Sequence, residues 1–351
     1  MANYIFETIT AAQALTYAGA DTLTFQTAGI SASQVSVLFN PGSVTTAESV
    51  TIATEGHTVT FATPLEGETD ITFSDGSILY IGVAGADNNP RAGGANNDAF
   101  FGNSGDDSFN GGAGANLFQG NQGADSMVGG AGADTMYGGQ DNDALTTGDG
   151  KNFAQGNMGN DTITGGAAAD RLYGGKGDDV VVGGGGGDYI NGNLGNDVLT
   201  GGVGTDTIYG EDGTDTISGG ASSSAFPNGA RDLLYGGAGA DRFVFGAGDS
   251  SPRAGEGDQI LDWATEDKIT FNAAAGSALN YTESTAATFA DAVALANNAI
   301  AAGTINYISV QVGTDVVIFA DAPNASDGNA DVAIVLVGRT LSDVDFGNIV
   351  V

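Results

Sequence analysis

The sequence predicts a mainly β protein with a parallel β-solenoid at its centre, a small β-domain before it, and a β-rich capping module with one helix after it. Three features of the 351 residues support this prediction: a nonapeptide that repeats in one register, an apolar residue at the same position of each repeat, and 59 glycines that permit tight turns. We expect the amino-terminal β-domain over 1–82, the solenoid over 83–250 and the carboxy-terminal module over 251–351.

The amino-terminal domain is predicted from short apolar runs that are separated by turn residues such as Asp75-Gly76. Alternating or continuous apolar residues bounded by such turns are typical of strands. The single histidine, His57, stands beside one apolar run. We interpret it as a turn or surface residue rather than as a metal ligand. The expected strands are Thr22–Phe25, Val35–Phe39, Val50–Ile52, Thr58–Phe61, Ile71–Phe73 and Ile78–Ile81.

The central region, from Gly93 to Ser218, consists of fourteen consecutive nonapeptides of the form G-G-x-G-x-D-x-U-x, where U is a large apolar residue. The first position is Gly in thirteen, the fourth is Gly in eleven, the sixth is Asp in twelve and the eighth is large and apolar in thirteen. A fifteenth unit contains eight extra residues around 222–229, and a sixteenth spans 236–244. A disordered acidic linker has no reason to keep this register, so that alternative is disfavoured.

Each nonapeptide is expected to form one short strand and one turn. Glycine permits the positive φ of a tight turn, and the x-U-x triplet forms a strand whose middle side chain points inward. Two nonapeptides then complete one coil, so that side chains at the eighth position stack on their equivalents two repeats further along the chain, as Phe100 on Phe118.

The sixth position places a carboxylate beside the carbonyl oxygens of each turn. An all-oxygen ligand set suits Ca²⁺, whereas Mg²⁺ gives up its water reluctantly. We therefore predict calcium as the cofactor, with on the order of a dozen ions offsetting much of the net charge of −34. Weaker binding is expected where Asn116 and Asn152 are neutral and where Asp141 and Ala168 replace turn glycines. The predicted metal-ligating residues are Asp98, Asp107, Asn116, Asp125, Asp134, Asp143, Asn152, Asp161, Asp170, Asp179, Asp188, Asp197, Asp206, Asp215, Asp232 and Asp241.

A longer period of four nonapeptides is superimposed on the short one, as the turns GNQGAD (120–125), GNMGND (156–161) and GNLGND (192–197) show. It places large apolar and aromatic residues at outward-pointing positions of one sheet. Tandem duplication without a selected surface is one interpretation, and a contact face for another subunit, a polysaccharide or a sheet is the other. The predicted assembly face consists of Phe101, Tyr137, Tyr173, Tyr209, Leu117, Phe153 and Tyr189.

The carboxy-terminal module begins with DQILDWATEDKITF (258–271), whose acids Asp258, Asp262 and Asp267 are further ligand candidates or solvated acids of a capping loop. A helix is expected over 285–302, because apolar residues recur there at helical spacing and Gly303 follows. The strands expected after it are Tyr307–Val312, Val316–Ala320 and Val332–Val337.

These motifs resemble the RTX (repeats-in-toxin) family. The nonapeptides match its repeat, and segment 258–271 is similar to the D-x-I-x-D-F-x-x-x-D-x-I segment that closes RTX arrays, with Trp263 in the Phe position. The resemblance implies a parallel β-roll in which calcium lies between turns of adjacent coils, so that each Asp acts with carbonyls of the unit two nonapeptides away. Over residues 75–351 the chain is similar to RTX proteins of S-layer and adhesin type, which implies an uncleaved carboxy-terminal signal for type I secretion.

The composition argues against several other classes of protein. With 43 acidic and 9 basic residues the chain lacks the basic face that a nucleic-acid binder needs. No cysteine and one histidine exclude a zinc finger, a thiol nucleophile and an H-E-x-x-H helix, so we expect no enzyme. The first residues lack a basic segment followed by an apolar run, and no apolar stretch approaches the length of a membrane-spanning helix, so neither a cleaved signal nor a membrane span is expected.

The sequence therefore predicts a secreted calcium-binding structural protein that folds on binding Ca²⁺ and assembles with itself at or outside the cell surface, as an S-layer, filament or matrix component. A monomeric adhesin or polysaccharide-binding RTX module is the alternative. The expected partners are further copies of the chain, cell-surface polysaccharide, and the type I secretion machinery in transit.

Overall fold

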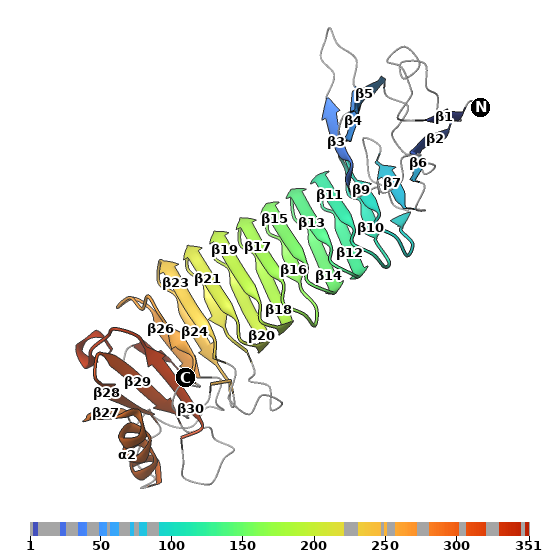
Figure 1. The fold of residues 1–351 in the computed structure, drawn as a ribbon. Coiled ribbons are helices and arrows are strands. Elements are labelled where there is room, and N and C mark those ends of the chain that lie inside the picture. Colours follow the sequence, from blue (N-terminus) through green and yellow to red (C-terminus); the bar gives the residue numbers. More distant parts are fainter. Residues whose placement is uncertain are drawn as a thin grey trace. The chain divides into compact units, whose positions relative to one another are not determined.

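The computed structural model describes residues 3–5, 22–25, 34–40, 49–54, 57–62, 71–73, 77–82, 91–220, 231–246, 249–250, 257–271, 281–301, 307–320, 330–344 and 348–350. The chain separates into two compact units, Met1–Thr164 and Gly165–Val351. Each unit contains coils of a parallel β-solenoid, and the second adds the one α-helix of the described residues (Figure 1). The predicted fold class is therefore confirmed.

The solenoid part of the first unit consists of two sheets of parallel strands. Neighbouring strands pair with an offset of two nonapeptides, as Phe118 with Met136 in one sheet and Met127 with Leu145 in the other. Each coil therefore contributes one strand to each sheet. One sheet contains β9 (Ala99–Phe101), β11 (Leu117–Gln122), β13 (Thr135–Gln140) and β15 (Phe153–Met158), and the other β8 (Arg91–Ala92), β10 (Ser108–Asn110), β12 (Ser126–Ala131), β14 (Ala144–Asp149) and β16 (Thr162–Thr164).

The core between the two sheets is formed by the eighth position of each nonapeptide, as predicted. Phe100, Phe109, Phe118, Met127 and Met136 are at most 1 % exposed. Phe100 and Phe118 stack with their ring centroids 5.1 Å apart. Burying each large apolar side chain contributes about 1.5–3 kcal/mol. This stack of eighth-position side chains, the core ladder, therefore stabilises each coil through contacts with its neighbours.

The amino-terminal strands join this solenoid through β7 (Ile78–Ile81), which runs parallel to β9 with Leu79 opposite Ala99. β6 (Ile71–Phe73) pairs antiparallel with β7 and parallel with β2 (Thr22–Phe25), which in turn pairs with β1 (Asn3–Ile5). A separate antiparallel sheet contains β3 (Ser36–Asn40), β4 (Ser49–Thr54) and β5 (His57–Ala62). All six predicted strands are present.

The second unit repeats the two-sheet arrangement. One sheet contains β17 (Arg171–Lys176), β19 (Tyr189–Leu194), β21 (Thr207–Asp212), β23 (Leu233–Ala238) and β25 (Gln259–Ile260); the other contains β18 (Val180–Gly186), β20 (Val198–Gly204), β22 (Thr216–Ser218), β24 (Arg242–Phe245), β26 (Lys268–Phe271) and β31 (Ile349–Val350). Thr207 pairs with Leu233 across the eight extra residues, so the insertion leaves the pairing intact. The insertion itself lies outside the described residues.

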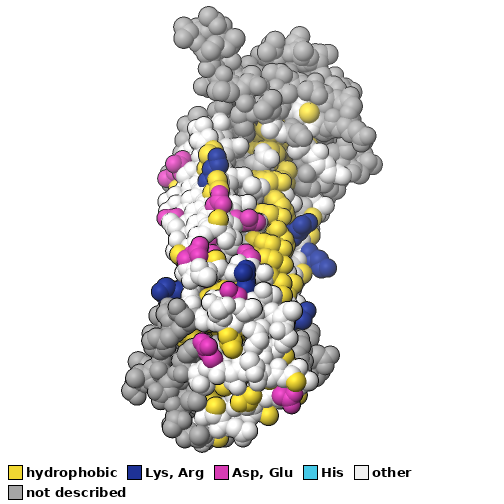
Figure 2. All heavy atoms as spheres, turned by 90° about the vertical axis from the view of Figure 1, so that its left-hand side faces the viewer, with side chains coloured by type: hydrophobic (Ala, Val, Ile, Leu, Met, Phe, Trp, Pro, Cys, Tyr) yellow, Lys and Arg dark blue, Asp and Glu magenta, His cyan; other side chains and the backbone are white. Residues whose placement is uncertain are grey.

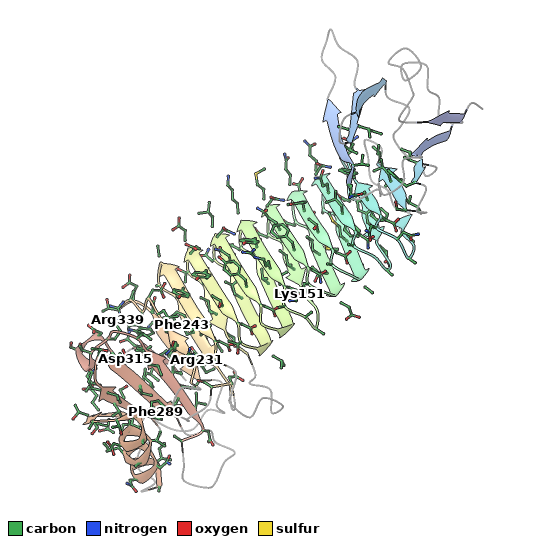
Figure 3. All side chains as sticks on the ribbon, viewed as in Figure 1. Lys151, Arg231, Phe243, Phe289, Asp315 and Arg339 are labelled. Carbon is green, nitrogen blue, oxygen red and sulfur yellow. The ribbon has the colours of Figure 1, made fainter. Side chains whose placement is uncertain are left out.

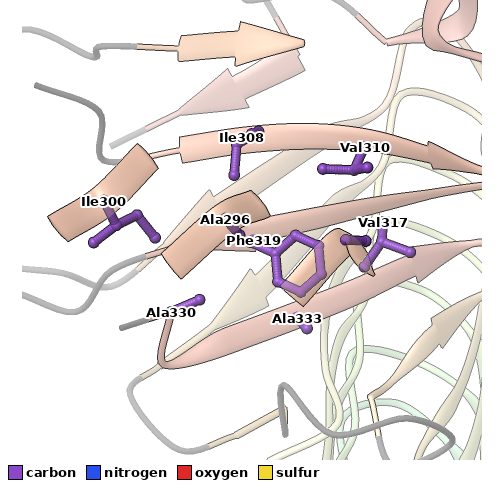
Figure 4. Close-up of a cluster of buried hydrophobic side chains, with 9 residues drawn as sticks. Ala296, Ile300, Ile308, Val310, Val317, Phe319, Ala330 and Ala333 are labelled. Atoms are coloured by element: carbon purple, nitrogen blue, oxygen red, sulfur yellow. The ribbon is translucent and has the colours of Figure 1, made fainter. Parts of the chain in front are cut away.

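The carboxy-terminal module contains β27 (Tyr281–Ala286), α2 (Phe289–Ala301), β28 (Tyr307–Val312), β29 (Asp315–Ala320), β30 (Val332–Leu336) and the 3₁₀ helix η3 (Leu341–Asp343). Ala296 and Ile300 of α2 pack on Ile308, Phe319 and neighbouring apolar side chains of the sheet (Figure 4). The predicted helix start was wrong, because residues 285–286 pair with β28 as the end of a strand.

The module covers the last coil of the second unit. β30 pairs in parallel with β25, with Ile260 opposite Leu336. Trp263 is buried, and its indole Nε1 donates a hydrogen bond to the Asp343 carbonyl at 3.1 Å. The strands of the module and the Trp263 ring therefore cover the last eighth-position side chains and shield them from solvent.

Candidate calcium-binding turns

Most turns between solenoid strands have left-handed backbone at their second and fourth positions. Gly112 and Gly114 have φ of 84° and 99°, and Gly130 and Gly132, one coil later, have φ of 102° and 133°. A Cβ at Gly132 would lie 2.0 Å from the carbonyl oxygen of Gly114. Glycine is needed here for its conformation and because successive turns approach closely.

The sixth-position carboxylates connect each turn to the turn one coil earlier. The Asp107 N–H donates to Oδ1 of Asp125, and the Asp125 N–H donates to Oδ1 of Asp143, both at 2.8 Å. The second unit repeats this bond, as from the Asp188 N–H to Oδ1 of Asp206. One oxygen of these carboxylates is thus used by the backbone, a role that the nonapeptide pattern did not predict.

The second carboxylate oxygen, Oδ2, is buried without a hydrogen-bond partner at many of these positions. Within the described part of the chain this holds for Asp125, Asp134, Asp143, Asp188, Asp197, Asp206, Asp215, Asp241 and Asp258. These side chains are at most 3 % exposed. Because a buried carboxylate oxygen without a partner is unfavourable, each such site requires a cation or a proton.

The Oδ2 atom faces a space that only glycine at the first position leaves open. A Cβ at Gly120 would lie 2.0 Å from Oδ2 of Asp125 and 2.5 Å from the carbonyl oxygen of Gly138. In the second unit, a Cβ at Gly201 would lie 2.4 Å from Oδ2 of Asp206. Carboxylate and carbonyl oxygens therefore converge in these turns, and hard oxygen donors are the set that Ca²⁺ takes. The residues present fit calcium.

Acidic side chains do not form the site by themselves. Among the residues that the structure describes, no three Asp, Glu or His side chains form a group that could hold a metal ion. The main-chain carbonyls of the turns would have to supply the remaining ligands, as the resemblance implied. Bound calcium would supply the positive charge that each buried carboxylate and its neighbouring carbonyls lack.

Burial raises the pKa of many sixth-position acids. Desolvation raises the pKa of Asp125 to about 8, and the charges of Asp143 and Asp107 add to the shift, whereas the Asp107 N–H opposes it. For the same main reason the pKa rises to about 7 at Asp143 and Asp188. Without a cation these groups resist ionisation at neutral pH.

The structure brings the predicted ligands into two rows in each unit. All sixteen side chains are buried. Two further acids extend the rows: Oδ1 of Asp258 accepts the Asp232 N–H at 2.9 Å, and Oδ1 of Asp267 accepts the Asp241 N–H at 3.0 Å. The rows of the first unit are Asp98, Asn116, Asp134, Asn152 and Asp107, Asp125, Asp143, Asp161; those of the second are Asp170, Asp188, Asp206, Asp232 and Asp179, Asp197, Asp215, Asp241.

Asp262, the third acid of the predicted capping segment, has a different position. Its carboxylate accepts the N–H groups of Gly236 and Gly237, each at 2.9 Å. It therefore caps the last turn of its row, and both of its oxygens are satisfied by the backbone.

Within each unit, aromatic side chains of the predicted assembly face form a column of rings. In the second unit Tyr173, Tyr189, Tyr209 and Tyr235 follow one another with centroids 5.6, 5.5 and 4.4 Å apart. In the first unit Tyr137 and Phe153 lie 5.5 Å apart. These side chains and Leu117 are half-buried. Hydrophobic side chains gather in a band on the face shown in Figure 2, with acidic side chains beside it.

Phe101 does not belong to this exposed face. It is 1 % exposed, and its lateral neighbour Ile81 on β7 is also buried. Both faces of β7 and β9 are covered at this end of the first unit, so an outward-pointing position there is not a surface position. The prediction that Phe101 is available for assembly was wrong.

These coils, with rows of buried carboxylates in glycine turns, define a calcium-binding β-solenoid. The family model for the RTX calcium-binding nonapeptide repeat (4 copies) matches residues 83–118, 92–127, 119–154, 155–190, 191–223 and 228–251. These parts of the chain therefore consist of RTX calcium-binding repeats.

Several solved structures are similar to parts of the chain. The AlgE6R3 subunit of the Azotobacter vinelandii mannuronan C5-epimerase is 27 % identical, with a TM-score of 0.31 over 52 % of this chain and 78 % of that one. The AlgE6R2 subunit is 26 % identical, with a TM-score of 0.27 over 51 % and 90 %. The extracellular lipase LipA of Serratia marcescens is 17 % identical, with a TM-score of 0.25 over 79 % and 40 %. No curated protein matches the chain.

Proposed function

We propose that the protein is a secreted, non-enzymatic structural protein that folds on binding Ca²⁺ and assembles with itself at or outside the cell surface. The observation that carries the proposal is the rows of buried aspartates whose Oδ2 atoms lack hydrogen-bond partners within the described turns. RTX repeats are typical of secreted proteins, and no helix of the described residues is long and apolar enough to cross a membrane.

Calcium would be held by the sixth-position carboxylates together with main-chain carbonyls of the glycine turns. Without it, ionised acids one strand spacing apart, about 5 Å, repel each other across a buried edge. Extracellular modules bind calcium at about 10⁻⁴–10⁻³ M, well above the range of cytosolic sensors. A chain with such sites would remain unfolded during export through a type I system and would fold outside.

The ring column supports contact with another protein surface over contact with polysaccharide. Tyr189 and Tyr209 each have a neighbouring ring on both sides, and Tyr209 and Tyr235 lie nearly parallel, at 10°. A sugar ring packs on an open aromatic face, and the faces of Tyr209 and Tyr235 are already turned toward one another. A second copy could cover the half-buried column once calcium has reduced the net charge of −34.

Circular dichroism and negative-stain electron microscopy of the same samples test both parts of the proposal. The chain should lack its β signal in EGTA, gain it in a few millimolar CaCl₂, and form sheets or filaments only with calcium. A folded β-solenoid in EGTA would contradict calcium-dependent folding. Calcium-folded particles that stay monomeric would favour the monomeric adhesin or polysaccharide-binding module, for which a glycan screen is the next test.

A further inference from the structure

Two turns of the first unit have asparagine in place of the sixth-position aspartate. The Asp98 N–H donates to Oδ1 of Asn116, and the Asp134 N–H donates to Oδ1 of Asn152, each at 2.8 Å. These are the same bonds that the aspartates make. Because an amide has only one oxygen, the place of the aspartate Oδ2 must be taken by an NH₂ group.

The NH₂ groups donate to carbonyls of their own turns. Nδ2 of Asn152 lies 3.1 Å from the carbonyl oxygen of Gly148 and 3.0 Å from that of Gly150, the second and fourth positions of its turn. Nδ2 of Asn116 lies 3.3 Å from the carbonyl oxygen of Gly114. Where an aspartate has an oxygen that needs a cation, these turns have donors that satisfy the carbonyls directly.

The Asn152 turn departs from the repeat in two more ways that disfavour an ion. Thr147 occupies the first position; one coil earlier, a Cβ at Gly129 would lie 2.4 Å from Oδ2 of Asp134. Thr147 is fully buried, so the space beside the sixth position is filled. Lys151 places an exposed ammonium group at the fifth position (Figure 3), where it would repel a bound cation.

We propose that the side-chain amides of Asn116 and Asn152 replace calcium, so that these two turns close without an ion. The inference rests on calcium binding by the aspartate turns. With this assignment, the two rows of sixth-position residues in the first unit differ from each other. One row alternates acid and amide, so its carboxylates lie two strand spacings, roughly 10 Å, apart. The other row, with Asp125 and Asp143, has an acid in every turn.

Counting bound calcium tests the proposal, with Asn116→Asp as the main variant. The unit 111–119 otherwise matches the repeat, since Gly111 and Gly114 are in place. At saturating calcium, equilibrium dialysis should give about one more ion per chain for Asn116→Asp than for the unmodified chain. Asn142→Asp is the matched control: it adds the same charge at an exposed fifth position, where Oδ1 accepts the Asn160 N–H, and should add no ion.

The outcomes separate the inference from the proposed function. An unchanged ion count in Asn116→Asp, or an equal gain in Asn142→Asp, would overturn the role of the amide. An unmodified chain that binds no calcium would overturn the proposed function itself. Thr147→Gly with Asn152→Asp should likewise restore an ion, because the double change removes both the amide and the filled space.

A reverse substitution tests turn closure without counting ions. Asp134→Asn and Asp134→Ala both remove the carboxylate, but only asparagine can donate to the turn carbonyls. In calcium titrations followed by circular dichroism, Asp134→Asn should reach half-folding at a lower calcium concentration than Asp134→Ala. Equal midpoints would show that the amide does not close a turn.

Discussion

At the scale of single residues, the first-position glycine decides whether a turn has room for its carboxylate. We predict that Gly120→Ala lowers the free energy of unfolding of the calcium-loaded protein by about 1–3 kcal/mol. The added Cβ would lie 2.0 Å from Oδ2 of Asp125 and 2.5 Å from the Gly138 carbonyl oxygen, so carboxylate and turn must move apart. Urea unfolding in saturating calcium measures the loss, and a calcium titration should show weaker binding.

Gly94→Ala is the control for this substitution. Gly94 also lies in a solenoid turn, but a Cβ there would meet no atom within 4 Å in the described structure. Its variant should unfold like the unmodified protein. If both substitutions lowered the free energy of unfolding equally, the cause would be a general loss of glycine flexibility rather than crowding of the carboxylate.

The sequence predicted which residues line the turns. It did not predict that, in turns such as that of Asp125, Oδ1 accepts a backbone N–H while Oδ2 is left for a cation. The position of Asp125 followed from the nonapeptide, because in a strict repeat the sixth residue of every unit lies at the same place in its turn. The bond from the Asp107 N–H to Oδ1 of Asp125 depends on the distance between coils, which only the packed structure defines. The amide contacts of Asn152 depend on the same distances.

At the scale of elements, the solenoid strands were predictable because one periodic pattern sets their length, register and inward face. Predictions failed where an element depends on what packs against it. Residues 285–286 were predicted to begin the helix, yet pairing with β28 makes them the end of a strand. Phe101 was predicted to point outward to the surface, yet the covering of β7 and β9 buries it.

The ring column yields a prediction about the outer sheet surface. Changing Tyr137, Tyr173 and Tyr209 together to Ser should leave calcium-dependent folding intact and abolish assembly. The lost ring contacts cost about 0.5–1.5 kcal/mol each, and the ladder under them is unchanged. Circular dichroism with calcium checks folding, and electron microscopy checks assembly.

A triple substitution on the second sheet controls for the loss of any exposed apolar surface. Val128, Val180 and Val198 are 37 %, 40 % and 45 % exposed on β12, β18 and β20. Changing them to Ser should leave assembly unaffected. If the Tyr variant still assembled, the column would be a product of duplication without a role in contacts.

At the scale of the whole molecule, the buried acids couple folding to both calcium and pH. In the calcium-free fold burial raises the pKa to about 8 at Asp125, about 7 at Asp206 and about 6 at Asp197, from 3.8. Between roughly pH 4 and pH 8 the folded state therefore binds more protons than the unfolded state, and stability falls as the pH rises. Calcium-free protein should gain β structure when the pH is lowered from about 8 to about 5, because protons replace the missing cations.

Bound calcium should weaken this dependence, because it favours the ionised carboxylates and protons compete with it. The gain in β signal that calcium causes should therefore be largest at about pH 8 and smaller at about pH 5. Circular dichroism spectra of calcium-free and calcium-saturated protein at both pH values measure the two trends together. If calcium-free protein lost structure on acidification, or if calcium stabilised equally at both pH values, the buried aspartates would not be the groups that link folding to calcium. Their rows would then be stabilised by the backbone bonds to Oδ1 alone.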